Sequence, residues 1–481
     1  MKSLGQLLHA AQLSNDISNS DEIVTLLCTH SKKCKEGSIF FAFKGQSSDG
    51  SAYVTEALQN GALVAIVDST AQVSEDKRII HVANPHKTFA LMNAAWFDYP
   101  QTSLRLIAVT GTDGKSSTAE ILHQLLTKEG IPTALFATTA IDDGTGKVPS
   151  PYRVSTPEAD ILYAFLDRCR SNSVRYVIIE ATSHGLSETY SRLYNLSFEI
   201  GIITTLSGDH LEFHQSREEY LQAKLALLPM ITKYFISSVE NQELARCLEH
   251  LKPPQKAIVL GRDYSYSVQA GKTFTIEGEF ERHRFTMQYV LPVFGTNALL
   301  ALLASSVVTK KDPKELLCHL PTLQPIHGRM QKVPNSKGVT IFIDYAHTIG
   351  AYEMLFTFIN QIKKNHKVIT VMGAAGGRDK EKRAILGSIA AHVSDILILT
   401  EEDPVFEELG AINAMIKTGI TSKTCTVLEI DDRRAAIAEA GAHAEKGDFI
   451  LLLGKGHERS IQRRDQSIPW NEEETVYEEI P

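Results

Sequence analysis

The stretch "LRLIAVTGTDGKSSTAEIL", residues 104–122, decides the fold class. Its first seven residues are apolar and β-branched enough for a buried strand, and the apolar residues that follow at 119–126 recur at helical spacing. Residues 111–117 therefore form a strand-to-helix turn. Backbone N–H groups of such a glycine-rich turn attract anions, Lys115 adds a positive charge, and the Ser116 hydroxyl suits a Mg²⁺ that bridges phosphates. The pattern predicts a nucleotide triphosphate site, with an ordinary turn as the alternative because the spacing GxxGKS is two residues shorter than the general P-loop.

Composition limits the class of protein. A chain of 481 residues exceeds one core and suggests about three domains of ~150 residues each. The 43% apolar and 22% charged residues are typical of a soluble globular protein, and a net charge of −8 gives no reason to expect a nucleic-acid partner. The N-terminus lacks a signal-peptide pattern, and no apolar run approaches the ~20 residues of a membrane span. We therefore expect a cytoplasmic protein without membrane insertion, whose cysteines are reduced thiols.

The order of predicted elements indicates an α/β protein of three domains, at residues 1–99, 100–329 and 330–481. Short β-rich segments at 37–45 and 61–68 alternate with helices in the first domain. Continuous apolar strands, the mark of a parallel sheet covered on both faces, define the second and third domains. We expect these strands at 104–110, 174–182, 198–205, 338–347, 367–379, 394–404 and 447–458. In open α/β sheets ligands gather at the carboxyl ends of the strands, so the polar loops that follow them are the functional candidates.

Several polar residues lie at those strand exits. Glu180 ends one apolar strand and His210 follows another, and a carboxylate and an imidazole near a phosphate loop suit a nucleotide-bound Mg²⁺. Lys224, in "EEYLQAKLALL", reads by itself as a solvated helix lysine. Further polar residues at strand ends or in loops are suited to bind phosphate or carboxylate groups. They are Arg329, Asp344, His347, Arg378 and Lys380. For each residue taken alone, a polar cap or a surface position is the alternative, and only the combination indicates a site.

Nine ordered motifs resemble those of the Mur ligase family. They are GTDGKSS (111–117), STPE (155–158), EATSHGL (180–186), DHLEFH (209–214), YLQAK (220–224), GRM (328–330), DYAHT (344–348), GGRDKEKR (376–383) and GKGHE (454–458). The similarity spans nearly the whole chain and is greatest to the enzymes that add the third residue of the peptide. It implies a first domain that binds the UDP end of the substrate, a central P-loop-type ATPase domain and a Rossmann-like C-terminal domain that binds an amino acid.

The resemblance implies an ATP- and Mg²⁺-dependent amide ligase of peptidoglycan precursor synthesis. ATP would phosphorylate the D-glutamyl carboxylate of UDP-MurNAc-L-Ala-D-Glu, and the α-amine of a free diamino acid would then displace phosphate from the acyl phosphate. The implied catalytic residues are Lys115, Glu180, His210 and Lys224. The implied metal ligands are Ser116, Glu180, His210 and Lys224, the last of these as a carbamate formed with CO2. A monomer is expected.

The family's binding positions carry over as three sets. Around ATP they are Gly111, Thr112, Asp113, Gly114, Lys115, Ser116, Ser117, Asn297, Arg329, Asp344 and His347. Around the UDP-linked dipeptide they are Ser31, Ser155, Thr156, Ser183 and Arg192. Around the incoming amino acid they are Arg378, Glu402, Asp403, Gly454 and Glu458.

Some positions depart from the family pattern. GTDGKSS has Asp113 where the family has Asn, Thr205 replaces an Asn before the DH motif, and Gly208 replaces an Arg. These changes leave open a catalytically inactive homologue that acts as an interaction scaffold. Folylpolyglutamate synthetase and a regulatory P-loop switch are further alternatives, which the first domain and the loops of the third domain disfavour.

The choice of amino acid depends on "TEEDPVFEE", residues 400–408. Relatives that add meso-diaminopimelate typically have DNPR here, with an arginine facing the distal carboxylate, and Val405 takes the place of that arginine. Loss of a bidentate carboxylate partner and the surrounding acidic residues favour L-lysine. Meso-diaminopimelate is the alternative, because GKGHE, with Gly454 and Glu458, looks more like the diaminopimelate-adding enzymes. The acidic residues read by themselves as a solvated helix start.

Overall fold

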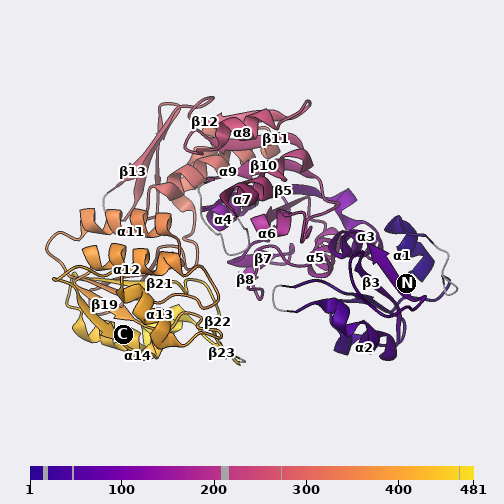
Figure 1. Cartoon of the computed structure of the whole chain (residues 1–481). Coiled ribbons are helices and arrows are strands. Elements are labelled where there is room, and N and C mark those ends of the chain that lie inside the picture. The colour runs from indigo at the N-terminus through magenta and orange to yellow at the C-terminus, as the bar shows by residue number, and fades with distance from the viewer. Residues whose placement is uncertain (15–19, 46–47, 207–215, 272–273, 465, 481) are drawn as a thin grey trace.

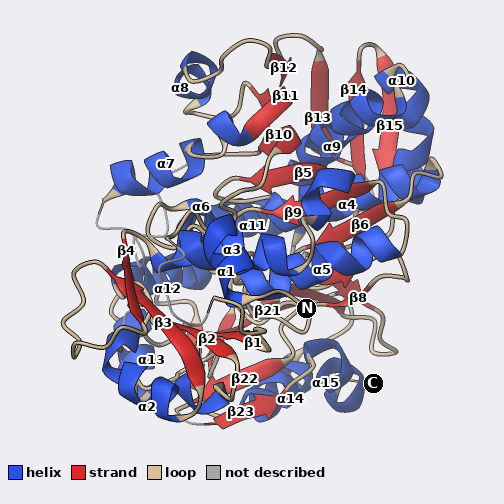
Figure 2. Ribbon diagram, turned by 90° about the vertical axis from the view of Figure 1, so that its right-hand side faces the viewer, coloured by secondary structure: helices blue, strands red, loops and turns tan. Residues whose placement is uncertain are grey.

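The computed structural model describes residues 1–14, 20–45, 48–206, 216–271, 274–464 and 466–480. Three sheets, each with its own helices, follow one another along the chain, and Figure 1 shows them as an indigo N-terminal, a magenta central and a yellow C-terminal part. Figure 2 shows the helices covering the faces of these sheets. The predicted α/β fold class is confirmed.

The N-terminal sheet has four parallel strands in the order β1-β2-β3-β4. Their bounds are β1 (Leu26–Cys28), β2 (Ser38–Phe41), β3 (Ala62–Asp68) and β4 (Ile79–Val82). The helices are α1 (Leu4–Ala10), α2 (Val54–Gln59) and α3 (Pro85–Trp96). The apolar run of β3 is buried because α1 and α3 pack on one face of the sheet and α2 packs on the other.

The central sheet has the order β12-β11-β10-β5-β9-β6-β7-β8, parallel from β12 to β6. Its strands are β5 (Arg105–Thr110), β6 (Thr133–Phe136), β7 (Ala140–Asp142), β8 (Val148–Pro149), β9 (Tyr176–Glu180), β10 (Phe198–Ile203), β11 (Ile231–Ser238) and β12 (Lys256–Leu260). One face packs against α4 (Lys115–Lys128) and α9 (Val293–Thr309), and the other against α5 (Ala159–Ser171). Since β5 lies between β9 and β10, the loops after all three strands meet at one edge of the sheet.

Short elements complete the central part. They are α6 (Ser183–Leu186), α7 (Arg217–Leu225), α8 (Leu244–Glu249), α10 (Pro313–Leu316) and an antiparallel sheet of β13 (Tyr266–Ala270), β14 (Ile276–Phe280) and β15 (His283–Met287). Sequence analysis did not predict that sheet. It leads directly into α9, and the inward side chains of β14 and β15, Ile276, Phe280, Phe285 and Met287, join the core that α9 shares with α4.

The C-terminal sheet has the order β16-β17-β21-β18-β19-β20, with only β16 antiparallel. Its strands are β16 (Gln331–Val333), β17 (Thr340–Asp344), β18 (Val368–Met372), β19 (Ile396–Leu399), β20 (Thr426–Glu429) and β21 (Phe449–Leu453). The helices α11 (Ile349–Ile362), α12 (Glu381–Val393) and α13 (Leu409–Lys417) cover one face, and α14 (Arg433–His443) and α15 (Glu472–Glu479) cover the other. A hairpin of β22 (Ser460–Arg463) and β23 (Gln466–Pro469) follows β21. The loops after β17, β18, β19 and β21 therefore point the same way, as expected for parallel strands.

Within the described ranges, no single helix combines the length and hydrophobicity that a membrane crossing requires. Residues Val293–Thr309 and Pro313–Thr322 meet that criterion only as a pair, which is bent by 116°.

Candidate active site

The turn between β5 and α4 has the geometry of an anion-binding loop. Gly114 precedes α4 with φ +82°, and Gly111 has φ +149°. A Cβ atom on Gly111 would lie 1.9 Å from the Thr204 hydroxyl oxygen, and one on Gly114 would lie 2.7 Å from Asn297 Oδ1. Only glycine fits both positions, so the backbone comes close to its neighbours and the first amides of α4 open toward the cavity described below.

A carboxylate and a hydroxyl meet beside this turn. The Ser116 hydroxyl donates to Glu180, 3.1 and 3.0 Å from its two carboxylate oxygens. Glu180, at the end of β9, also accepts from the backbone N–H and the hydroxyl of Thr138, both at 3.0 Å. Mg²⁺ prefers oxygen ligands, so the Ser116 hydroxyl and the Glu180 carboxylate, which meet beside the phosphate loop, fit such a cation.

The other predicted metal ligands are His210 and Lys224. His210 lies outside the described residues, which contain no group of three His, Cys, Asp or Glu side chains suited to a metal ion. Among the described residues, Ser116 and Glu180 are thus the two members of the predicted set that meet beside the phosphate loop.

A half-buried and a buried lysine share one backbone carbonyl. Lys115 Nζ lies 3.1 Å from Gly111 O and 2.9 Å from Thr112 O, and Lys224 Nζ, from α7, lies 2.7 Å from Gly111 O. Burial lowers the pKa of the Lys115 ammonium, with Glu180 and Asp113 opposing the shift. Burial lowers the pKa of Lys224 well below its ordinary value, and the charge of Lys115 adds to this shift. The site thus favours one ammonium and one neutral amine.

The linker that precedes β16 and the loop after β17 form the next wall. The Arg329 guanidinium donates to the Ser116 hydroxyl at 3.3 Å and lies 4.7 Å from the centre of the Tyr345 ring. Asp344 fastens these segments, because its carboxylate accepts from the Met330 N–H at 2.6 Å and the Ala346 N–H at 2.7 Å. Burial raises the pKa of Asp344 despite these contacts. The side chain therefore supports the loop from inside.

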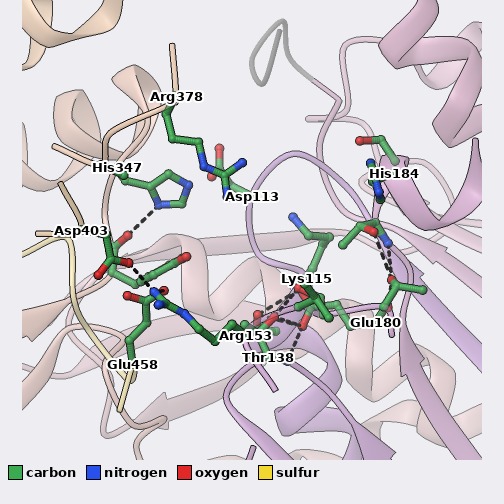
Figure 3. Close-up of a pocket in the computed structure, with 18 of the residues that line it drawn as sticks. Asp113, Lys115, Thr138, Arg153, Glu180, His184, His347, Arg378, Asp403 and Glu458 are labelled. Atoms are coloured by element: carbon green, nitrogen blue, oxygen red, sulfur yellow. Dashed lines mark hydrogen bonds and ion pairs between the residues drawn. The ribbon is translucent and has the colours of Figure 1, made fainter. Parts of the chain in front are cut away.

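The loops after β19 and β21 bring four charged side chains together. Lys455 Nζ lies 2.9 Å from Asp403 Oδ1 and 2.5 Å from Glu458 Oε2. Arg153, on the loop between β8 and α5, reaches the same two carboxylates, with Asp403 as an ion-pair partner and Glu458 Oε1 at 3.4 Å. Figure 3 shows the Arg153 side chain extending from the central part of the chain toward Asp403 and Glu458.

Glu402 lies deeper in the same wall. Glu402 is buried, its carboxylate makes no hydrogen bond to another residue of the described ranges, and a Cβ atom on Gly454 would lie 2.5 Å from its Oε2. Burial raises the pKa of Glu402 to about 7, since the charge of Lys455 offsets only part of the desolvation. Because Glu402 Oε2 lies so close to Gly454, a side chain at position 454 would collide with this carboxylate, and glycine is needed there.

A buried arginine positions these two loops. Arg433, in α14, donates to the carbonyl oxygens of Leu453 at 2.9 Å and of Glu401 at 3.3 Å. Its guanidinium is paired with the Glu472 carboxylate of α15, with Nε lying 3.1 Å from Oε1. One side chain thus holds the ends of β21 and β19 together.

The predicted substrate-binding residues of the central part lie on the side of the phosphate loop that faces the N-terminal part. The Thr156 hydroxyl donates to Glu180 O at 2.8 Å, and Arg192 donates to Thr156 O at 2.9 Å and pairs with Glu158 at 2.5 Å. Nearby, the rings of Tyr190 and His184 stack with centroids 3.5 Å apart. These residues form a polar and aromatic wall between the phosphate loop and the N-terminal part.

One cavity of about 740 Å³ joins these walls. The predicted residues that line it are Thr112, Asp113, Gly114, Lys115, Ser116, Ser117, Ser155, Thr156, Glu180, Ser183, Arg192, Lys224, Arg329, His347, Arg378, Glu402, Asp403 and Glu458. Gly111, Asn297, Asp344 and Gly454 support it from behind, as described above. Lys380, Thr205 and Ser31 do not line it, and Ser31 is buried in the N-terminal part, where its hydroxyl donates to Glu56 at 2.5 Å.

Among the residues of this cavity and its walls that sequence analysis did not assign to the site are Thr138, Arg153, Tyr345 and Lys455. Tyr345 and Lys455 lie inside quoted motifs and could have been found from their neighbours. Arg153 lies two residues before Ser155, but nothing local in the sequence shows that it reaches the C-terminal loops.

Comparison with known proteins follows this geometry. Sequence models match most of the chain: the catalytic domain of the Mur ligase family at residues 23–105, the Mur ligase middle domain at 109–308 and the Mur ligase glutamate ligase domain at 328–456. The chain belongs to the Mur ligase family, close to its MurE members.

Individual relatives agree with this assignment. The UDP-N-acetylmuramyl-tripeptide synthetase of Borreliella afzelii is 32% identical over 468 residues, which cover 93% of this chain and 91% of that protein. The UDP-N-acetylmuramoyl-L-alanyl-D-glutamate–2,6-diaminopimelate ligase of Caldanaerobacter subterraneus is 30% identical over 96% of this chain and 95% of that one. A solved structure of a diaminopimelate ligase of the same name has a TM-score of 0.64 at 24% identity, covering 100% of this chain and 99% of that chain, and shows the same fold.

Proposed function

We propose that this protein is an ATP-dependent amide ligase that joins a diamino acid, L-lysine, to the D-glutamyl carboxylate of UDP-MurNAc-L-Ala-D-Glu. One observation carries the proposal: a single cavity connects the phosphate loop and Glu180 with Thr156 and with the charged loops that end β19 and β21. Such a cavity can hold a nucleotide, a peptide carboxylate and an amine together. Bringing reactants together in this way supplies a large part of the catalysis in a ligase.

The chemistry follows from the weakness of a carboxylate as an electrophile. The carboxylate oxygen attacks the γ-phosphorus of ATP, ADP leaves, and an acyl phosphate remains. The α-amine then attacks the acyl carbon, phosphate leaves with the electron pair of the C–O bond, and the amine loses a proton to give the amide. Lys115 offsets negative charge that develops on the phosphoryl group, and Arg329, next to Ser116, adds a second cation.

Mg²⁺ fits the pair of Ser116 and Glu180, because both offer oxygen ligands beside the phosphate loop, one at the start of α4 and one at the end of β9. When bound there, the ion would neutralise phosphate charge. Thr138 would keep the Glu180 carboxylate oriented through two hydrogen bonds.

Carbamylation of Lys224 is part of the proposal. A neutral amine attacks CO2 and loses a proton to give a carbamate, whereas an ammonium does not react. Burial and the neighbouring Lys115 lower the pKa of Lys224, so the amine is available near neutral pH. The product replaces a potential cation with a carboxylate-like metal ligand beside the phosphate loop.

L-lysine is preferred to meso-diaminopimelate because the loop after β19 has Val405 where an arginine would face a distal carboxylate. The wall offers the carboxylates of Glu402, Asp403 and Glu458 instead. Both kinds of enzyme occur among the relatives, so the residues of the loop carry this preference. Arg378 lines the same cavity and suits the α-carboxylate that both amino acids share.

Phosphate release tests the function. We expect ADP and phosphate to form only when UDP-MurNAc-L-Ala-D-Glu and an amino acid are both present with Mg-ATP, and a tripeptide product to appear by mass spectrometry. An inactive scaffold would give neither, a regulatory switch would hydrolyse ATP without the amino acid, and a folylpolyglutamate synthetase would require a folate instead. Equal concentrations of L-lysine and meso-diaminopimelate in one reaction then decide between the two substrates.

A further inference from the structure

Arg153 connects the central part of the chain to the loops that the proposed function assigns to the incoming amino acid. Its backbone lies two residues before Ser155, in the wall that faces the UDP-linked peptide. Its guanidinium crosses the cavity and pairs with Asp403 and Glu458 (Figure 3). The only other cation on these two carboxylates, among the ion pairs of the described residues, is Lys455.

The two cations divide the carboxylate oxygens between them. Lys455 uses Asp403 Oδ1 and Glu458 Oε2, whereas Arg153 uses Asp403 Oδ2 and Glu458 Oε1. The Lys455 side chain is fully buried, but 37% of the Arg153 side chain is exposed. Lys455 is therefore a permanent part of the wall, and Arg153 can leave it.

The charges of the wall call for one cation from the cavity side. Asp403 and Glu458 carry two negative charges and Lys455 carries one positive charge, so these three residues have a net charge of −1 before the partly ionised Glu402 is counted. Both carboxylates are mostly buried, with side-chain exposures of 11% and 15%, so an unpaired charge there is costly. In the structure, Arg153 supplies the missing cation.

We propose that Arg153 is a specificity-determining residue, a resident cation that holds the place of the substrate's side-chain ammonium and leaves when the amino acid binds. This inference rests on the proposed function. It narrows the substrate class to amino acids whose side chain ends in one cation without a carboxylate. In meso-diaminopimelate, the side-chain ammonium would already balance the charge of Asp403, Glu458 and Lys455. The distal carboxylate of the same substrate would then add an unpaired negative charge to this wall.

Competition between Arg153 and the substrate gives the test. The variants are Arg153→Ala, Arg153→Lys and the control Arg168→Ala, which removes an exposed arginine of α5 that pairs with Asp143. Each is assayed for ADP release with UDP-MurNAc-L-Ala-D-Glu and either L-lysine, L-norleucine or meso-diaminopimelate. L-norleucine has the carbon chain of lysine without the ammonium.

We expect Arg153→Ala to lower the KM for L-lysine at least threefold and to leave the KM for L-norleucine unchanged. Arg153→Lys and Arg168→Ala should both resemble the unmodified enzyme. An unchanged or higher KM for L-lysine in Arg153→Ala would overturn the proposal. So would a higher KM for meso-diaminopimelate in that variant, because Arg153 would then be a partner of the distal carboxylate.

A binding measurement separates this inference from the proposed function. L-lysine is titrated calorimetrically into each variant, after thermal melting has established that the variant is folded. Tighter binding to Arg153→Ala supports the inference even if turnover is absent, and equal or weaker binding overturns it. Absence of ADP formation by the unmodified protein with all three amino acids contradicts the proposed ligase activity instead.

Discussion

Lys115 and Lys224 differ in role although they share one hydrogen-bond acceptor. Both amines lie against Gly111 O in the interior, where two adjacent positive charges would repel each other strongly. The pKa of Lys224 is the more strongly lowered, because the charge of Lys115 adds to the effect of burial there, whereas Glu180 and Asp113 oppose the effect of burial at Lys115. Lys115 therefore acts as the cation and Lys224 as the neutral amine.

Replacement of Lys115 tests the first role. Lys115→Ala removes a charge that offsets the transferring phosphoryl group, so we expect kcat to fall by at least ~100-fold, as for loss of other transition-state donors. Steady-state ADP release measures this. Lys128→Ala, at the exposed end of the same helix, is the control. Near-normal turnover of Lys115→Ala would contradict the assignment.

Replacement of Lys224 tests the second role. Lys224→Ala should be nearly inactive and should regain part of its activity with formate or acetate, because the missing group is an anion. Methylamine serves as the matched cation and should have no effect. For the unmodified enzyme, removal of CO2 should lower activity and bicarbonate should restore it. Rescue by methylamine instead of acetate would exclude a carbamate.

Glu402 gives a prediction about stability and pH. Its folded-state pKa, about 7, is above the ordinary value of a glutamate, so between pH 4.5 and 7 the folded state binds more protons than the unfolded state. Its contribution to stability is then fully present below the ordinary pKa and is lost as pH rises through 7. We expect Glu402→Gln to become the more stable protein above pH 7, by about 2 kcal/mol. Urea unfolding at pH 5 and pH 8 measures the difference, and an equal difference at both pH values would contradict the prediction.

At the residue level, sequence reasoning found the groups that lie at strand ends or in glycine-rich turns. Glu180, Lys115 and Asp403 were accessible in this way. The burial of Lys224 could not be predicted, because the sequence of α7 by itself indicates a solvated lysine. Only the packing of α7 against the phosphate loop buries this side chain. Arg153 was missed since its partners lie about 250 residues away along the chain.

At the level of elements, the continuous apolar strands of the parallel sheets were predicted well. The strands expected at 198–205 and 447–458 correspond to β10 and β21, which are apolar on both faces because helices cover both. The sheet of β13, β14 and β15 was missed. β14 and β15 place charged or polar residues between their buried ones, and β13 has no buried residue, so no apolar run marks these strands.

The turn before α4 allows a test of backbone geometry. Gly114→Ala introduces a side chain at φ +82° and against Asn297, whereas Gly130→Ala, just past the end of the same helix, introduces one at φ +70° with no atom within 4 Å. Both should lose about 1 kcal/mol of stability from the left-handed backbone. Only Gly114→Ala should raise the KM for ATP, by tenfold or more. Equal KM values for the two variants would show that the turn does not bind the nucleotide.

For the whole molecule, the linker between the central and C-terminal sheets touches the loop after β21. Gly328 has φ +66°, and a Cβ atom there would lie 2.2 Å from the backbone nitrogen of His457. Arg329 and Glu458, the neighbours of Gly328 and His457 along the chain, both line the cavity. The packing of one glycine therefore sets the spacing between the nucleotide wall and the amino-acid wall.

Gly328→Ala should separate these walls. We expect kcat to fall at least tenfold while the secondary structure measured by circular dichroism is retained, because reacting groups lose their alignment. Gly338→Ala is the matched control: it has φ +73° but meets only the flexible side chain of Lys446. Comparable activity of the two variants would show that the contact with His457 is not needed for alignment.

The continuity of the 740 Å³ cavity has a consequence for inhibitor design. A compound that carries a phosphate mimic at one end and an ammonium at the other could occupy the turn before α4 and displace Arg153 at once. The second group would then bind intramolecularly, at a high effective concentration set by the length and stiffness of the linker. Because the two ends are recognised by different parts of the chain, such a compound would also fix their relative position.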